Sequence, residues 1–150
     1  MRRKREILNT MRVKIPAISE NEGLARAVVA AFCTGLDPTL SELSDIKCSV
    51  SEAITNCIVH AYGKEKGYIY INLALTEDGE VRIEIRDNGC GIPDVSRARE
   101  PLYTTDTTGE RSGMGFSVME SFMDSLCVFS KEGKGTRIIM TKRISQKRKR

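Results

Sequence analysis

The sequence predicts an α/β sandwich of two layers, an α+β fold in which helices cover a mixed, mostly antiparallel sheet. Two strand pairs, 68–86 and 126–142, are each joined by a short turn that contains glycine. Strands joined in this way pair antiparallel, because a parallel pair needs a long crossover. Helical segments 19–35 and 37–62 precede the first pair, and segment 115–126 precedes the second. Helices grouped in this way form a layer on the sheet, unlike the alternating crossovers of a doubly wound fold.

A first strand is predicted by the alternation of apolar and charged residues, and a first helix by a candidate N-terminal cap. Between residues 11 and 18, apolar side chains alternate with charged ones, and Pro16 favours a position at the edge of the sheet. Ser19 and Glu22 fit a capping box, in which the Ser19 hydroxyl accepts from the third helical amide and Glu22 reaches back. We expect this helix to run to about Gly35.

The second helix is expected to begin at Asp37-Pro38 and to end near Tyr62-Gly63. Proline is tolerated in a first helical turn, and glycine adopts the left-handed terminal conformation without strain. One stripe of this helix is apolar and predicts the face that it buries: Ile46, Val50, Ala53, Ile54, Cys57 and Ala61.

The first hairpin is expected to join strands 68–75 and 81–86 through a turn at 76–80. Its second strand alternates apolar and charged residues, so one face packs and the other is wet. The segment that follows, from Asp87 to Pro93, is too rich in glycine to continue the strand.

The last third of the chain is expected to hold a loop, a helix and a second hairpin. From Ser96 to Gly113 the sequence is polar and without periodicity, which is typical of a loop or lid. A helix should then run from Gly115 to about Leu126 and be followed by strands 126–130 and 136–142.

The composition is that of one cytosolic domain. A length of 150 residues suits a single core. No stretch has the pattern of a signal peptide or of a membrane span, so we expect a cytoplasmic protein without membrane binding. The five cysteines are odd in number and lack CxxC spacing, which favours reduced thiols over disulfides or a zinc site.

The net charge of +4 arises at the two ends of the chain. Ten of the 24 Lys and Arg residues lie in segments 1–6 and 142–150, so the body between them carries 14 basic and 19 acidic residues. Basic ends without interleaved aromatic residues are weak support for nucleic-acid binding, and we expect no direct DNA binding. The predicted organisation is a basic extension, 1–10, a folded domain, 11–142, and a basic tail, 143–150.

Four short segments could carry chemistry. Glu52, Asn56 and His60 form a polar ladder on one face of the second predicted helix, although such ladders are usually just solvated. Three further segments share closely spaced glycines: Asp87-Asn88-Gly89-Cys90-Gly91, Gly113-Met114-Gly115 and Gly133-Lys134-Gly135-Thr136. Taken alone, the first and third suit turns, and the second suits a loop that opens a helix, where free amides also favour phosphate.

Other common site chemistries are not supported by the sequence. It contains no GxxxxGK[ST] phosphate loop, no GxGxxG turn after a strand and no GxSxG elbow. A single histidine, without a fixed Ser or Cys partner, gives no support to a hydrolytic nucleophile or to a metal held by paired histidines.

In their order, however, the four segments resemble the motif boxes of the ATP-binding family shared by gyrase, Hsp90, histidine kinases and MutL (GHKL), which has the Bergerat fold. The resemblance covers about residues 11–142. The stretches SENEGLAR (19–26), SEAITNCIVHAY (51–62), PLYTT (101–105) and ERSGMGF (110–116) further resemble the anti-sigma F factors, the stage II sporulation protein AB family of serine kinases. The related general-stress anti-sigma serine kinases are the nearest alternative.

This resemblance implies a site for ATP or ADP with Mg²⁺. Asn56 would bind the metal, Asp87 would accept a hydrogen bond from the adenine amino group, and Thr136 would support that contact through water. The glycines would let the backbone approach the base and the phosphates. The residues implied to bind the nucleotide are Asn56, Asp87, Gly89, Gly91, Thr104, Thr105, Gly113, Gly115 and Thr136.

The resemblance also implies catalytic and partner-binding residues. Glu52 would be the general base for a substrate serine, and Arg111 would reach the γ-phosphate. His60 matches the end of the family's helix, where a packing role is implied. Arg26 matches a position that contacts protein partners, although a surface ion pair with Glu22 is an equally simple interpretation.

The implied function is an ATP-dependent switch. As a homodimer the protein would hold sigma F away from RNA polymerase. When the anti-anti-sigma factor (stage II sporulation protein AA) binds instead, it would phosphorylate a serine of that partner. Two alternatives stay open at this point: an anti-sigma module that binds nucleotide without catalysis, and the catalytic domain of a sensor histidine kinase.

Overall fold

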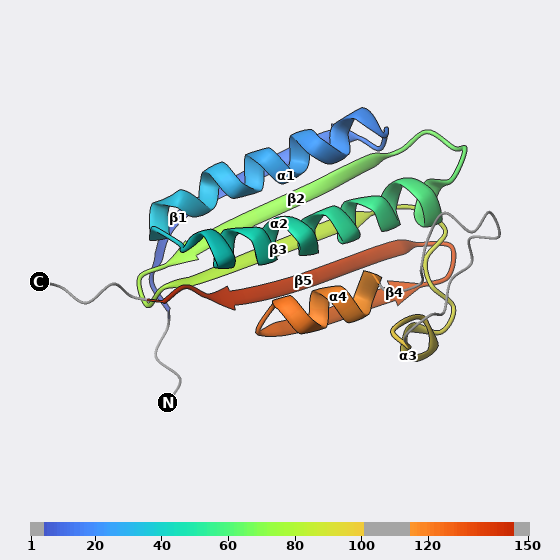
Figure 1. Ribbon diagram of the computed structural model, residues 1–150. Coiled ribbons are helices and arrows are strands. Elements are labelled where there is room, and N and C mark those ends of the chain that lie inside the picture. The colour runs from blue at the N-terminus through green and yellow to red at the C-terminus, as the bar shows by residue number, and fades with distance from the viewer. Residues whose placement is uncertain (1–4, 101–114, 146–150) are drawn as a thin grey trace, which may run out of the picture.

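A computed structural model describes residues 5–100 and 115–145. Its elements are, in chain order, β1 (Ile7–Pro16), α1 (Glu20–Cys33), the 3₁₀ turn η1 (Thr34–Leu36), α2 (Leu40–Thr55), the π-helix η2 (Asn56–Tyr62), β2 (Tyr68–Thr76), β3 (Glu80–Asp87), α3 (Val95–Ala98), α4 (Gly115–Phe122), β4 (Ser125–Lys131) and β5 (Gly135–Arg143). Helices α1, α2 and α4 lie on one face of a five-stranded sheet (Figure 1). The predicted two-layer α+β sandwich is confirmed.

Every strand pairing is antiparallel, in the order β1-β2-β3-β5-β4. Both predicted hairpins are present, and β1 is an edge strand that ends at Pro16, as the proline predicted. β1 begins at Ile7, before the predicted start at Met11, because its pairing with β2 continues as far as Ile7 opposite Thr76.

The core lies between the helix layer and the sheet. The stripe predicted for the second helix forms one wall, since Ile46, Val50, Ala53, Ile54 and Cys57 are each at most 1% exposed, while Ala61 is only partly buried. Alternate residues of the neighbouring strands β2 and β3 contribute to the other wall: Ile69, Ile71, Leu73, Leu75, Val81, Ile83 and Ile85. Both periodicities were visible in the sequence.

The two helix starts differ from the prediction. Ser19 has helical dihedral angles, φ −56° and ψ −35°, and makes no capping hydrogen bond with its side chain. An N-cap hydroxyl needs an extended backbone to reach the amides of the first turn, so the predicted capping box at Ser19 is wrong. The capping box lies instead at Thr39, whose Oγ1 accepts from Glu42 N at 3.1 Å while Glu42 Oε1 accepts from Thr39 N at 2.9 Å. The second helix therefore begins at Leu40, after Pro38.

Three further boundaries were not predicted. The second helix changes to a π-helix at Asn56, and Gly63 ends it at φ 57° and ψ −114°, outside the left-handed helical region that we expected. The single turn α3 falls in the predicted loop and is capped by Asp94, whose Oδ1 accepts from Arg97 N at 3.0 Å. α4 ends at Phe122, before the expected Leu126, because β4 already begins at Ser125.

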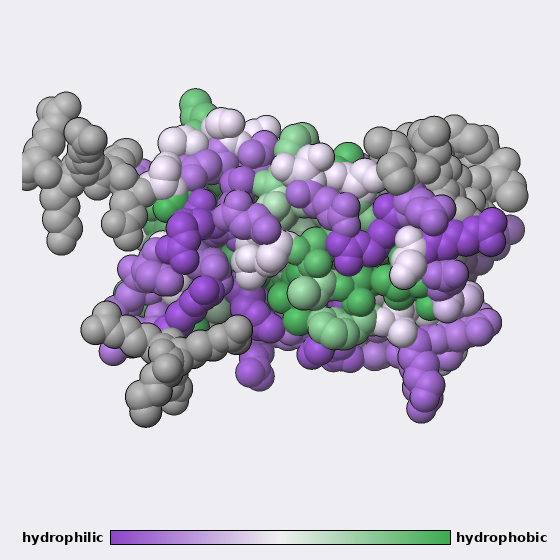
Figure 2. Space-filling view, turned by 90° about the horizontal axis from the view of Figure 1, so that it is seen from below, coloured by the Kyte–Doolittle hydropathy of each residue, from purple (hydrophilic) through white to green (hydrophobic). Residues whose placement is uncertain are grey.

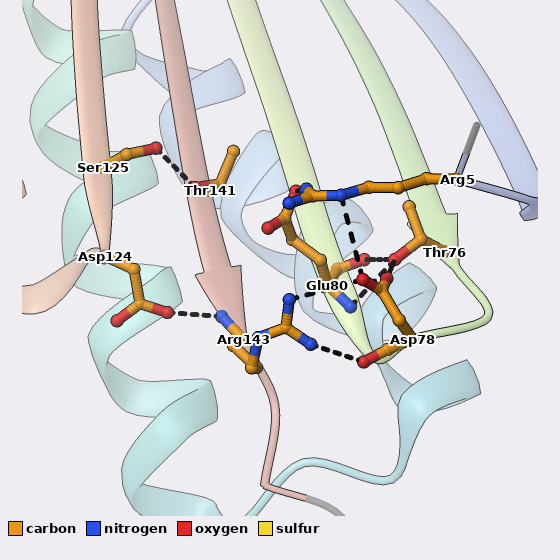
Figure 3. A network of polar contacts seen from close by, with 8 residues as sticks. All are labelled: Arg5, Thr76, Asp78, Glu80, Asp124, Ser125, Thr141 and Arg143. Atoms are coloured by element: carbon orange, nitrogen blue, oxygen red, sulfur yellow. Dashed lines mark hydrogen bonds and ion pairs between the residues drawn. The ribbon is translucent and has the colours of Figure 1, made fainter. Parts of the chain in front are cut away.

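A polar network joins the chain ends to the β2–β3 turn (Figure 3). Arg143 donates to the Asp78 carbonyl oxygen at 2.6 Å, and its own amide donates to Asp124 Oδ2 at 2.5 Å. Arg5 pairs with Glu80 and with Asp78. The predicted basic tail thus begins with structured residues, since Ser145 N also donates to Glu42 Oε2 at 2.8 Å.

The edge formed by β4 is less polar than its surroundings. Seen from below the view of Figure 1, apolar side chains gather in the middle of a mostly hydrophilic surface (Figure 2). On β4, Phe129 is 51% exposed, while Leu126 and Val128 are partly buried against the core.

None of the described helices is both long enough and apolar enough to cross a membrane.

Replacing Thr39 by alanine should lower the free energy of unfolding by about 1 kcal/mol, because Thr39 Oγ1 then no longer accepts from Glu42 N, while the backbone amide of residue 39 can still donate to Glu42 Oε1. Urea denaturation followed by circular dichroism measures this change. Ser19→Ala is the matched control and should leave stability within about 0.5 kcal/mol of the parent, as for surface sites without such features. Equal losses in the two variants would contradict the assignment of the cap.

Candidate functional site

The candidate site begins where the end of α2 meets the start of α4. Glu52 and Asn56 lie one helical turn apart, and Gly115 faces both of them. A Cβ at Gly115 would lie 3.1 Å from Glu52 Oε2 and 3.6 Å from Asn56 Oδ1. Glycine therefore keeps the space in front of these two side chains clear. The same space adjoins the first turn of α4, where unpaired amides and the helix dipole favour an anion.

The π-helix η2 connects this space to the glycine-rich segment after β3. A π-helical turn does not use its carbonyl groups in the α-helical pattern, and such turns occur frequently at functional sites. At the end of η2, the Ala61 carbonyl oxygen accepts from Cys90 N at 2.9 Å, and that of His60 accepts from Cys90 Sγ at 3.2 Å. The polar ladder and the glycine segment are thus joined directly, which the sequence did not predict.

Two glycines of this segment let backbone pack directly on backbone. A Cβ at Gly89 would lie 2.4 Å from the Ala61 carbonyl oxygen, and a Cβ at Gly91 would lie 2.1 Å from that of Lys131. Gly91 also has φ 74°. No larger residue fits either place, so contacts within the protein already require these glycines.

Asp87 is the buried acid of the site. It ends β3, is 4% exposed, and accepts from Gly89 N at 2.9 Å and from the Cys57 thiol. Burial raises the pKa of the Asp87 carboxyl group above its ordinary value, although these hydrogen bonds act in the opposite direction. Burial and the neighbouring Asp87 also raise the pKa of Cys57.

Thr136 lies directly opposite Asp87 in the pairing of β3 with β5. Thr136 is 7% exposed, and its Oγ1 lies 2.8 Å from Ser130 Oγ. Ser130 Oγ in turn accepts from Ile92 N at 2.7 Å, which ties the glycine-rich segment to the second hairpin. Ser130 was missed in the sequence, where only its register opposite Thr136 could have indicated it.

Tyr62 is a second connecting residue that was missed. Its hydroxyl group accepts from Asn88 N at 2.7 Å and donates to the Tyr68 carbonyl oxygen at 2.7 Å. Its ring lies against Gly67, where a Cβ would come within 2.2 Å of Tyr62 Cε1. Tyr62 therefore fixes the segment that follows Asp87 relative to both η2 and β2.

Arg26 lies beside the ladder, on α1. Its Nη1 is 3.5 Å from Glu22 Oε1 and donates to Ser51 Oγ at 3.3 Å, and its side chain is 43% exposed. The ion pair with Glu22 is present, and the side chain still reaches the surface next to Glu52.

Several implied site residues cannot be placed. Thr104, Thr105, Arg111 and Gly113 lie outside the described residues. Within the described ranges, no group of three or more His, Cys, Asp and Glu side chains could hold a metal ion. Asn56 is thus the metal ligand that the implied Mg²⁺ site would take from this part of the chain.

The sequence matches those of known proteins over most of its length. A family profile described as the histidine kinase-like ATPase domain matches residues 15–142. An anti-sigma F factor of Clostridium perfringens (strain SM101) is 53% identical over 137 residues, which make up 91% of this chain and 98% of that protein. The chain belongs to the anti-sigma F factor family of histidine kinase-like ATPase domains. A member of this family from Caldanaerobacter subterraneus subsp. tengcongensis is 52% identical and covers 95% of this chain and 99% of its own.

Solved structures show the same fold at lower identity. The RsbU and RsbW domains of a Mycobacterium tuberculosis protein match with a TM-score of 0.68 at 20% identity, over 93% of this chain and 33% of that one. The catalytic domain of histidine kinase ThkA matches with a TM-score of 0.57 at 16% identity, over 91% and 97% of the two chains. At these identities the likenesses concern the fold alone, and this fold is the one expected for a histidine kinase-like ATPase domain.

Asp87→Asn should change how stability depends on pH. The pKa of Asp87 is higher in the folded protein than in the unfolded chain, where it is about 3.9. Above that pH the folded protein therefore holds more of this proton than the unfolded chain does. The contribution of Asp87 to the free energy of unfolding consequently falls as pH rises. The variant lacks that loss. Urea denaturation without nucleotide measures the free energy of unfolding of variant and parent. The value for the variant minus the value for the parent should increase as pH rises from about 4 toward neutrality.

The result for Asp87 has a clear contrary outcome. A difference between variant and parent that stays constant over this pH range, or that moves in favour of the parent, would show that burial does not raise the pKa of Asp87.

Tyr62→Phe should weaken nucleotide binding while the protein stays folded. The variant keeps the ring against Gly67 but loses the hydroxyl group that holds Asn88 N, at a cost of about 1 kcal/mol for a lost hydrogen bond. Titration with a fluorescent ATP analogue should show an affinity roughly fivefold lower. Tyr70→Phe is a control from the other face of the sheet and should bind as the parent does; equal affinity in both variants would remove this role of Tyr62.

Proposed function

We propose that the protein inhibits sigma F by binding it, and that it uses ATP with Mg²⁺ to phosphorylate a serine of an anti-anti-sigma factor, stage II sporulation protein AA. Membership of the anti-sigma F factor family supports the first part, and the histidine kinase-like ATPase domain supports ATP-dependent kinase chemistry. One observation carries the mechanism: Gly115, at the start of α4, faces both Glu52 and Asn56.

The residues present fit a magnesium nucleotide. Mg²⁺ usually keeps several waters and takes few protein ligands beside phosphate oxygens, so one amide oxygen, from Asn56, is an adequate protein contribution. Clearance at Gly115 and the amides that open α4 suit phosphate groups. Asp87, buried and held by Gly89 N, suits an adenine amino group as its donor, with Thr136 as its neighbour. When bound, the magnesium nucleotide supplies the phosphoryl group and offsets its charge.

The side chains then have separate tasks in the transfer. Glu52 orients the substrate serine and takes its hydroxyl proton as the serine oxygen bonds to the γ-phosphorus. The bond between that phosphorus and the bridging oxygen breaks, and ADP leaves with the electron pair. Arg111 and the Gly113 amide stabilise negative charge on the γ-phosphate. Thr104 and Thr105 complete the nucleotide contacts in this proposal.

The proposed assembly has two further parts. Arg26, exposed on α1 and hydrogen-bonded to Ser51, is proposed to contact the protein partners close to Glu52. A homodimer is proposed from the family resemblance. We place the protein in the cytoplasm, where its proposed partner sigma F would act with RNA polymerase.

A labelling experiment tests this function. The protein is incubated with [γ-³²P]ATP, Mg²⁺ and the anti-anti-sigma factor, and binding of sigma F is measured in parallel by co-sedimentation. Acid-stable phosphoserine on the partner is expected. Sigma F binding without phosphoserine would leave a non-catalytic anti-sigma module, and acid-labile phosphohistidine would favour a histidine kinase domain. Preference for a general-stress sigma factor would favour the related stress kinases.

Two variants should separate the base from the metal ligand. Glu52→Gln should lower the rate of phosphoryl transfer by about 10²- to 10⁴-fold while ATP and sigma F still bind, because only proton transfer is lost. Asn56→Ala should instead lose the Mg²⁺-dependent part of ATP affinity, as titrations with and without EDTA would show. Transfer at the parent rate in Glu52→Gln would remove the base role and leave the binding roles standing.

A further inference from the structure

One row of side chains crosses the face of the sheet that the helices leave uncovered. The strand register places Lys14 opposite Tyr70, Tyr70 opposite Arg86, Arg86 opposite Arg137, and Arg137 opposite Phe129. These five residues, here the cross-sheet row, include one from every strand. The helices cover one face of the sheet (Figure 1). The chain neighbours of the row, such as the core isoleucines of β3 and β5, are buried beneath them, and because side chains alternate along a strand, the row faces the other side.

Aromatic rings hold the cations of this row. Lys14 Nζ lies 4.3 Å from the ring centroid of Tyr68 and 5.7 Å from that of Tyr70. Arg86 Cζ lies 4.2 Å from the Tyr70 centroid, and Arg137 Cζ lies 4.8 Å from that of Phe129. Cations stacked on rings lose some of their freedom before any ligand arrives.

The cations of the row are held by neutral groups of the described residues: besides the rings, Arg86 Nη1 donates to Asn88 Oδ1 at 3.0 Å. In the described parts of the chain, Lys14, Arg86 and Arg137 form no ion pair with a carboxylate. The nearby carboxylate of Glu84 is already used, because it lies 3.8 Å from Arg82 Nη2 and accepts from Asn72 at 3.3 Å. This positive face contrasts with the acidic balance of the body of the chain.

We propose that the cross-sheet row docks an acidic polypeptide segment. Carboxylates complement the three cations of the row, and Tyr68 and Phe129, 48% and 51% exposed, offer apolar contact to the stems of acidic side chains. A second copy that paired through the same face would bring like charges together. Single-stranded nucleic acid would stack its bases on open ring faces, whereas here a cation already occupies one face of each of the three rings.

The proposed surface and the nucleotide site lie on opposite faces of the same strands, although the charge of Arg86 opposes the rise in the pKa of Asp87. The pair Arg86–Arg137 is next in register to the pair Asp87–Thr136. Because side chains alternate along a strand, the first pair faces the open side and the second faces the helices. An acidic segment on the row should therefore bind whether or not ATP is present.

Fluorescence anisotropy with labelled oligoglutamate at low ionic strength tests the proposal. The double variant Lys14→Gln/Arg137→Gln should bind this probe roughly fivefold more weakly than the parent, as expected for the loss of two exposed charge contacts. Lys47→Gln, an exposed lysine on α2, is the matched control and should bind as the parent does. Saturating ATP should leave the affinity of the parent for oligoglutamate unchanged, and retained ATP binding shows that the double variant is folded.

Each contrary result overturns a stated part of the proposal. Oligoglutamate that binds no better than labelled oligoglutamine, or that binds equally to the parent and the double variant, removes the docking surface. Labelled oligothymidine that binds more tightly than oligoglutamate, and is lost in the double variant, makes the occupant a nucleic acid. Competition between ATP and oligoglutamate places the probe in the nucleotide site.

Discussion

The candidate site depends on backbone packed directly on backbone around Asp87. The segment after β3 lies against the end of η2 at Gly89 and against the second hairpin at Gly91, where any side chain would collide with a carbonyl group. Gly135 completes the arrangement, with φ 102° and room for no Cβ next to the Asp87 carbonyl oxygen. Three distant parts of the chain meet here without side chains between them. The position of the buried acid is therefore set by contacts that only glycine permits.

This close packing has a cost that the ligand can offset. A buried carboxylate loses hydration, and the Gly89 amide and the Cys57 thiol replace only part of it, so the pKa of Asp87 is raised. A ligand that donates a hydrogen bond to this carboxylate would make up part of the loss. One hydrogen bond would then both recognise the amino group of the proposed adenine ligand and stabilise the buried carboxylate of Asp87.

Features that repeat along the chain were predictable, and features that join distant segments were not. The stripe from Ile46 to Cys57 and the alternation of β3 gave the helix layer and the sheet, because burial on one face imposes a period. Ser19 and Thr39 are each followed by glutamate three residues later, so the four-residue capping pattern does not distinguish them, whereas the backbone angles of the first residue do. Tyr62 and Ser130 bridge residues that are distant in sequence, so no local pattern indicated them.

The register of β3 against β5 connects the two surfaces proposed for this protein. With Asp87 opposite Thr136 on the helix side, Arg86 and Arg137 must face the open side together. A slip of β3 by one residue would turn Arg86 into the core and expose Asp87, and a slip of β5 would turn Arg137 into the core, so either slip would bury an unpaired charge at high cost. The glycine contacts that hold Asp87 in place thus also hold the cations of the opposite face in one row. The proposed nucleotide site and the cationic face consequently share a single structural constraint, because both depend on the same register of β3 against β5.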